Sequence, residues 1–193
     1  MKKIFNIILI ILILTGCKQT ENDNTKVGNA ENKIVENKFV PKYGNSFFNF
    51  DEIEYYQIEI SEDKAMDLFD TQNKSQTDKL KFDIVVGEEP RNLKNLKFIN
   101  SLSEIGFTKS QIPQSKFKEI NQIFTEKTVY ENYAAACVAV YRDILVFKKD
   151  KKIIGLCKIC FDCRLFRFVG TNANTENFGQ DGDFEKLSEI LRN

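Results

Sequence analysis

The polar and apolar positions divide the chain into three parts. Residues 4–14 form an almost unbroken apolar run, and a stretch rich in Lys, Asn, Glu and Thr follows it. This second stretch has too few apolar side chains to offset the entropy that it would lose on ordering. We therefore predict an N-terminal leader at residues 1–16, a flexible tether at residues 17–45 and a single folded domain at residues 46–193.

The predicted domain combines two hydrophobic periods, the alternation of strands and the three-to-four-residue spacing of helices. The predicted strands are residues 51–60, 141–147 and 152–159, and the predicted helices are residues 62–69, 93–105, 115–127 and a C-terminal helix from residue 183. Ser61 and Asp183 are suitable N-caps for the first and last helices. Residues 80–86 fit either a strand or the end of a helix. Together these elements predict an α+β fold, with a small antiparallel sheet and helices packed on one face.

Composition narrows the classes of function. The 193 residues include 28 Lys and Arg, 28 Asp and Glu, and no His. Without His, a His-based catalytic triad and an imidazole proton shuttle are both excluded. A nucleic-acid partner is not expected, because neutralising phosphates requires a surplus of Lys and Arg on one surface.

The leader has the features of an export signal. Lys2 and Lys3 precede the apolar run, which is shorter than the roughly 20 residues that a membrane-spanning helix needs. The segment that follows, Leu14-Thr-Gly-Cys17, resembles the lipobox of bacterial lipoproteins, with Leu14, Gly16 and Cys17 at the matching positions. This resemblance implies that Cys17 receives a diacylglyceryl group, that the chain is cut before it, and that the new amino terminus is acylated.

The resemblance also implies a location in the cell envelope. Several acyl chains make membrane attachment close to permanent, because each buried CH₂ contributes about 0.8 kcal/mol. The residue after Cys17 is Lys18 rather than Asp, which in Gram-negative lipoproteins implies the outer membrane. We therefore expect a protein that is lipid-anchored at the outer membrane, on either its periplasmic or its surface side.

Four cysteines remain in the predicted domain, and an even number in an exported chain favours two disulfide bonds. They are Cys137, Cys157, Cys160 and Cys163. A hairpin of the last two predicted strands, centred on Asp150, places Cys137 opposite Cys163, within disulfide distance. A bulge would instead bring Cys160 opposite Cys137. Both pairings remain open.

The sequence gives weaker support for a redox site, a metal site or a calcium loop than for disulfide bonds. Cys160 and Cys163 have the spacing of a thiol-redox motif, but no clear helix follows to lower a thiol pKa. Four cysteines can also bind zinc or part of an iron–sulfur cluster, although thiols outside the cytoplasm tend to oxidise first. Residues 172–183 have the oxygen spacing of a calcium loop without its Gly and its final Glu. We expect no metal, no cofactor and no catalytic residue.

These observations predict a membrane-anchored, non-catalytic binding or structural module. Its expected partners are the membrane, reached through the lipid on Cys17, and another envelope protein or a secreted protein. The alternative is a periplasmic thiol-redox or metal-handling protein that uses Cys137, Cys157, Cys160 and Cys163.

Substituting the lipidated cysteine tests the anchor. Cys17→Ala should move the protein out of the membrane fraction and leave its precursor uncut, because acylation precedes cleavage in the family that the leader resembles. Cell fractionation and metabolic labelling with a palmitate analogue measure both effects. Label that persists on the variant would contradict attachment at Cys17.

Overall fold

The computed structural model describes residues 43–128 and 137–193. The predicted leader, Cys17 and the tether as far as residue 42 lie outside these residues. The last three tether residues, 43–45, belong to the first strand of the fold. In the described part of the chain, no helix combines the length and the apolar character needed to cross a bilayer.

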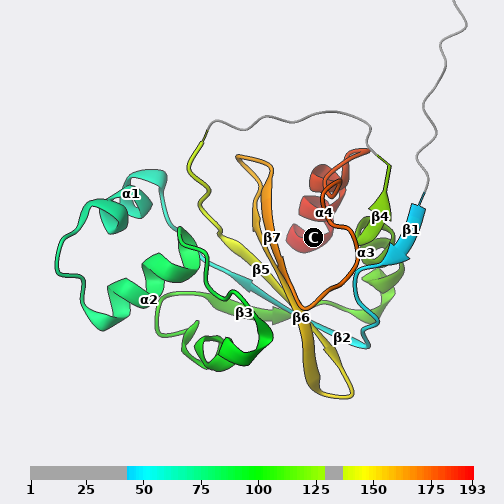
Figure 1. The fold of residues 1–193 in the computed structure, drawn as a ribbon, viewed down its shortest axis with the longest axis horizontal. Coiled ribbons are helices and arrows are strands. Elements are labelled where there is room, and N and C mark those ends of the chain that lie inside the picture. Colours follow the sequence, from blue (N-terminus) through cyan, green and yellow to red (C-terminus); the bar gives the residue numbers. More distant parts are fainter. Residues whose placement is uncertain (1–42, 129–136) are drawn as a thin grey trace, which may run out of the picture. The chain divides into compact units, whose positions relative to one another are not determined.

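Two antiparallel sheets form the framework (Figure 1). The larger sheet has the strand order β3-β2-β5-β6-β7, and the smaller one pairs β1 with β4. The strands are β1 (Tyr43–Ser46), β2 (Glu52–Gln57), β3 (Thr108–Gln111), β4 (Thr125–Lys127), β5 (Asp143–Lys149), β6 (Lys152–Cys160) and β7 (Leu165–Val169). The predicted α+β class with a small antiparallel sheet is confirmed.

Helices lie in the β2–β3 and β3–β4 connections and after β7. They are α1 (Glu62–Asp70), α2 (Gln76–Val85), the 3-10 helices η1 (Leu93–Ser101) and η2 (Gln114–Lys116), α3 (Phe117–Ile123) and α4 (Asp183–Arg192). The predicted cap of α1 is confirmed, because the Ser61 hydroxyl accepts a hydrogen bond from the backbone N–H of Lys64. The predicted cap of α4 is wrong. Gly182 is its N-cap, and Asp183 is already helical.

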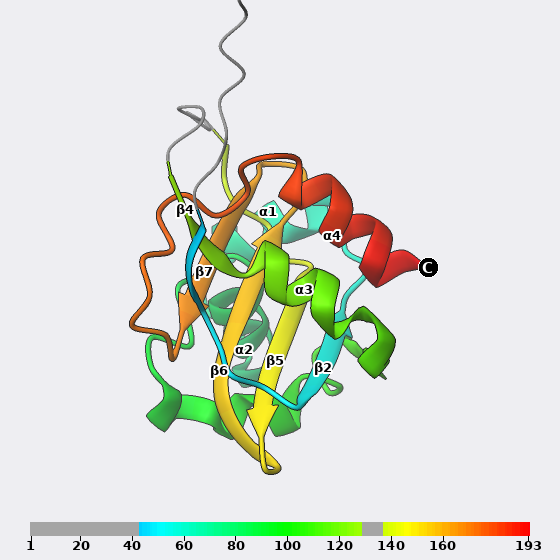
Figure 2. The same cartoon turned by 90° about the vertical axis from the view of Figure 1, so that its right-hand side faces the viewer.

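The helices cover both faces of the larger sheet, rather than the single face predicted. In β5, Leu145 and Phe147 face one hydrophobic core, whereas Ile144 and Val146 face another. Figure 2 shows α3 and α4 on the near side of the sheet and α1 and α2 behind it. Because apolar residues occupy consecutive positions of the central strands, both faces must be shielded from water.

The core beneath α3 and α4 consists largely of phenylalanine rings. The rings of Phe47 and Phe168 have centroids 5.1 Å apart, as do those of Phe124 and Phe178. Most of these contacts are edge-on or tilted, the arrangements that aromatic quadrupoles favour. This core holds α3 and α4 on the sheet and so positions the surface between them.

The opposite core contains a fully buried lysine, Lys158 of β6. Its ammonium group donates hydrogen bonds to the carbonyl oxygens of Ile84, Gly87 and Glu89 at 2.7–2.9 Å. It also lies 4.5 Å from the centroid of the Tyr141 ring. Burial lowers the pKa of Lys158 to about 7. Because three acceptors match the three donors of an ammonium group, Lys158 fastens the end of α2 to the sheet.

The register of the central hairpin differs from the predicted one. Leu145 pairs with Cys157, where a hairpin centred on Asp150 would pair it with Gly155. The turn is shifted by half a residue, and an irregularity beside Phe147 shifts the register further. The chain then reverses after Cys160 and returns as β7. We did not predict β7, which pairs with β6 at the edge of the larger sheet.

A disulfide bond joins Cys137 to Cys163, whose Cα atoms are 6.2 Å apart. Neither cysteine is in a strand, so the hairpin ladder from which we derived this pairing does not extend to it. The bond instead connects the segment before β5 to the turn between β6 and β7. Arg142 and Asp162 form an ion pair between the same two segments, 2.6 Å from nitrogen to oxygen.

Removing the disulfide should destabilise the domain. Cys137→Ser should lower the free energy of unfolding by about 2–4 kcal/mol, because the bond closes a loop between residues 26 apart in sequence. Chemical denaturation under oxidising conditions measures this loss.

Cys163→Ser should cost as much, and the double variant should cost no more than either single one, since both remove the same bond. If Cys137→Ser left the free energy of unfolding unchanged, the disulfide bond would not contribute to stability.

Candidate functional site

The four cysteines of the domain do not converge on a common site. Cys163 is bonded to Cys137, and Cys157 and Cys160 are free and buried. Because Cys157 and Cys160 are three residues apart in β6, their side chains point to opposite faces of the sheet. The expected second disulfide is therefore absent from the described residues. Burial also raises the pKa of Cys157 well above its usual value, which makes this thiol a poor nucleophile.

The loop at residues 172–183 leads into α4 and makes contacts within the protein. The backbone N–H of Asn174 donates to the Glu126 carboxylate at 2.8 Å, and Asp183 is paired with Lys127. Across residues 43–128 and 137–193, no group of three or more His, Cys, Asp or Glu side chains is arranged to hold a metal ion.

A pocket of about 450 Å³ lies between α3 and α4, and we call it the α3–α4 pocket. It is lined by Tyr43, Lys116, Glu119, Gln122, Ile123, Lys127, Asp181, Asp183, Lys186, Glu189, Ile190 and Asn193. Its volume is within the range of small-molecule sites. The lining combines two isoleucines with charges of both signs, so the pocket can bind a ligand that is partly apolar and partly ionic.

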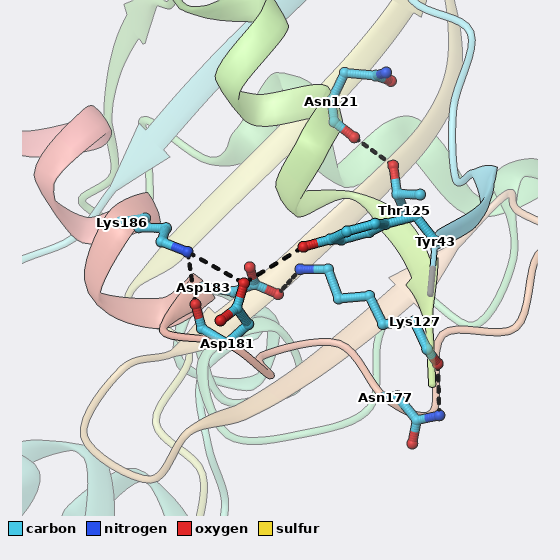
Figure 3. Close-up of polar contacts among 8 residues, drawn as sticks. All are labelled: Tyr43, Asn121, Thr125, Lys127, Asn177, Asp181, Asp183 and Lys186. Carbon is cyan, nitrogen blue, oxygen red and sulfur yellow. Dashed lines mark hydrogen bonds and ion pairs between the residues drawn. The ribbon is translucent and has the colours of Figure 1, made fainter. Parts of the chain in front are cut away.

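A buried ion pair between Lys127 and Asp183 forms part of the pocket wall (Figure 3). Their side chains are only 2% and 3% exposed. Burial raises the pKa of the Asp183 carboxyl, and its hydrogen bond from Lys127 works in the opposite direction. The pair ties β4 to the start of α4 across 56 residues of sequence.

Two further hydrogen bonds fix the strand that carries Lys127. The Thr125 hydroxyl donates to the carbonyl oxygen of Asn121 at 2.5 Å, and the Asn177 side-chain amide donates to the carbonyl oxygen of Lys127 at 2.8 Å. Figure 3 shows both bonds at the two ends of β4. They connect β4 to the end of α3 and to the loop before α4, and so hold this side of the pocket in place.

Tyr43 covers one end of the pocket. Its hydroxyl donates to the Asp181 carboxylate at 3.4 Å, and its ring centroid lies 5.8 Å from the Lys127 ammonium nitrogen. Burial and the nearby Asp181 charge raise the pKa of Tyr43, so the phenol keeps its proton. Lys186 in turn donates to the carbonyl oxygen of Asp181 at 2.6 Å.

Sequence reasoning did not find this pocket. Asp183 was expected as a helix cap and as the last position of a weak calcium-loop pattern, and neither Lys127 nor Tyr43 was singled out. A single Lys among polar neighbours gives no local signal that it will be buried. The predicted helix at residues 115–127 is wrong at its end, because α3 stops at Ile123 and Thr125–Lys127 form β4. The partner of Lys127 is also distant in the sequence.

Comparison with known proteins identifies the N-terminal segment. Residues 1–17 match the family described as a prokaryotic membrane lipoprotein lipid attachment site. No curated protein and no solved structure matches the chain. This match supports a membrane-anchored lipoprotein of the cell envelope that carries a signal peptide.

Breaking the buried ion pair should destabilise the domain strongly. Lys127→Met should cost about 3–5 kcal/mol at neutral pH, because it leaves the Asp183 carboxylate buried without its partner. Urea denaturation measures the loss. Lys186→Met is the matched control and should cost less than about 1 kcal/mol, since the Lys186–Asp181 pair is exposed.

The loss of stability in Lys127→Met should also depend on pH. Folded Asp183 holds its proton to a higher pH than unfolded Asp183, so its contribution to stability falls as pH rises through the raised pKa. Without Lys127 that pKa rises further. The deficit of Lys127→Met should therefore shrink as pH falls toward about 4. A deficit that stays constant between neutral and acid pH would contradict the pairing.

Proposed function

We propose that this lipoprotein is a non-catalytic binding module of the outer membrane that captures its ligand in the α3–α4 pocket. Lys18 at the position after Cys17 supports the outer membrane, as the resemblance to Gram-negative lipoproteins implies, and fatty-acyl chains such as palmitate on Cys17 would supply the anchor. The ligand comes from the envelope or from a secreted partner.

The observation that carries this proposal is the construction of the pocket. Its wall is fixed by the Lys127–Asp183 pair, while the side chains of Lys116, Glu119 and Glu189 have no ion pair or side-chain hydrogen bond among the described residues. A rigid wall beside uncommitted charges suits recognition, because the binding groups need little reorganisation.

Binding without catalysis is supported by the chemistry of the same residues. Lys127 and Asp183, the most buried titratable groups of the pocket, neutralise each other. The chain has no His to act as a general base near neutral pH. The two free thiols, Cys157 and Cys160, are buried and are not part of the pocket lining. This arrangement does not favour the alternative of a thiol-redox or metal-handling protein.

Thermal unfolding with envelope fractions tests the proposal. The full lipoprotein, purified in detergent, is incubated separately with the small-molecule and the protein fractions of its own envelope. One fraction should raise the melting temperature by about 5 °C, as expected for a ligand well above its dissociation constant. Mass spectrometry should recover the bound ligand chemically unchanged.

Variants inside and outside the pocket lining test whether the rise in melting temperature comes from binding in the α3–α4 pocket. Lys116→Met with Glu189→Gln should abolish the shift, whereas Lys118→Met, in the first turn of α3 and outside the pocket lining, should retain it. The proposal fails if neither fraction changes the melting temperature, if the double variant responds like the wild type, or if the ligand is converted.

A further inference from the structure

The charges that line the α3–α4 pocket are only partly compensated. Seven charged side chains line it, and four of them form two pairs, Lys127 with Asp183 and Lys186 with Asp181. The remaining three are Lys116, Glu119 and Glu189, which carry one positive and two negative charges. A complementary ligand therefore has one negative and two positive groups.

The positions of these three residues determine how the charged groups should be arranged along the ligand. Lys116, the last residue of η2, and Glu119, in the first turn of α3, are three residues apart and both line the pocket. Side chains at this spacing along consecutive helical turns lie as neighbours. Glu189 lines the pocket from a different helix, α4. One anionic and one cationic group should therefore be adjacent in the ligand, and the second cationic group should be separated from them.

The pocket also offers apolar contact between its two charged walls. Ile123 of α3 and Ile190 of α4 both line it. A short hydrocarbon segment that joins the two ends of the ligand would cover these side chains and lose its own contact with water.

We propose that the α3–α4 pocket binds a free diamino monocarboxylic acid, of which lysine and ornithine are the common examples. This inference rests on the proposed binding function. The α-carboxylate lies against Lys116 and the α-ammonium against Glu119. The methylene chain crosses Ile123 and Ile190, and the terminal ammonium pairs with Glu189.

Isothermal titration of the full lipoprotein in detergent tests this assignment with three probes. L-lysine has all three charges, norleucine lacks the terminal ammonium, and cadaverine lacks the carboxylate. Lysine should bind, and each of the other two should bind at least about tenfold more weakly, since each loses one charge-assisted contact.

Variants of the charged residues assign each group of the ligand. Glu189→Gln should remove the discrimination between lysine and norleucine, and Lys116→Met should remove that between lysine and cadaverine. Lys118→Met is the matched control and should leave all three affinities unchanged. Circular dichroism and unfolding curves establish that each variant is folded. Lys118 and Glu189 are exposed, and Lys116 is partly exposed.

Three results would overturn the assignment. They are the absence of lysine and ornithine binding at millimolar concentration, equal binding of the three probes, and discrimination that survives Glu189→Gln. If the pocket variants still abolish the thermal shift caused by an envelope fraction, the binding function stands and only the ligand class is wrong. If they do not, both fail.

Discussion

The arrangement of the described domain depends on one constraint, that the central hairpin of β5 and β6 is apolar on both faces. Leu145 and Phe147 face one core, and Ile144 and Val146 face the other. A strand with this pattern must be covered on both sides. The helices therefore form two separate layers, with α1 and α2 on one side and α3 and α4 on the other (Figure 2). The α3–α4 pocket lies in the second layer, where two short helices meet over an aromatic core.

Both layers contain a buried lysine that has at least one hydrogen-bond partner. Lys158 donates to three backbone carbonyl oxygens, and Lys127 pairs with Asp183. Such groups cost desolvation energy, so a buried ion pair adds little net stability over an apolar pair of similar size. What they provide is a defined geometry, because only one arrangement satisfies every donor and acceptor. At the α3–α4 pocket this defined geometry holds the wall against which a ligand would bind.

The proposed function depends on two features of the protein, the lipid attachment site and the α3–α4 pocket. The lipid attachment site anchors the protein to a membrane of the cell envelope. Tyr43, which we predicted to be part of the tether, instead belongs to β1 and lines the pocket. The charges left uncommitted there, one positive and two negative, are the feature of the surface that a small ionic ligand can use.

The sequence by itself determined the features that depend on adjacent residues. The lipid attachment site is a contiguous segment ending at Cys17, and the Ser61 cap lies within one turn of the group it binds, so both could be read locally. The positions of β5 and β6 followed from their apolar pattern. Tertiary structure alone decided the hairpin register, the return of the chain as β7 and the opposite orientations of Cys157 and Cys160. It also decided that Lys127 meets Asp183, because a contact between residues 56 apart leaves no mark on the sequence around either one.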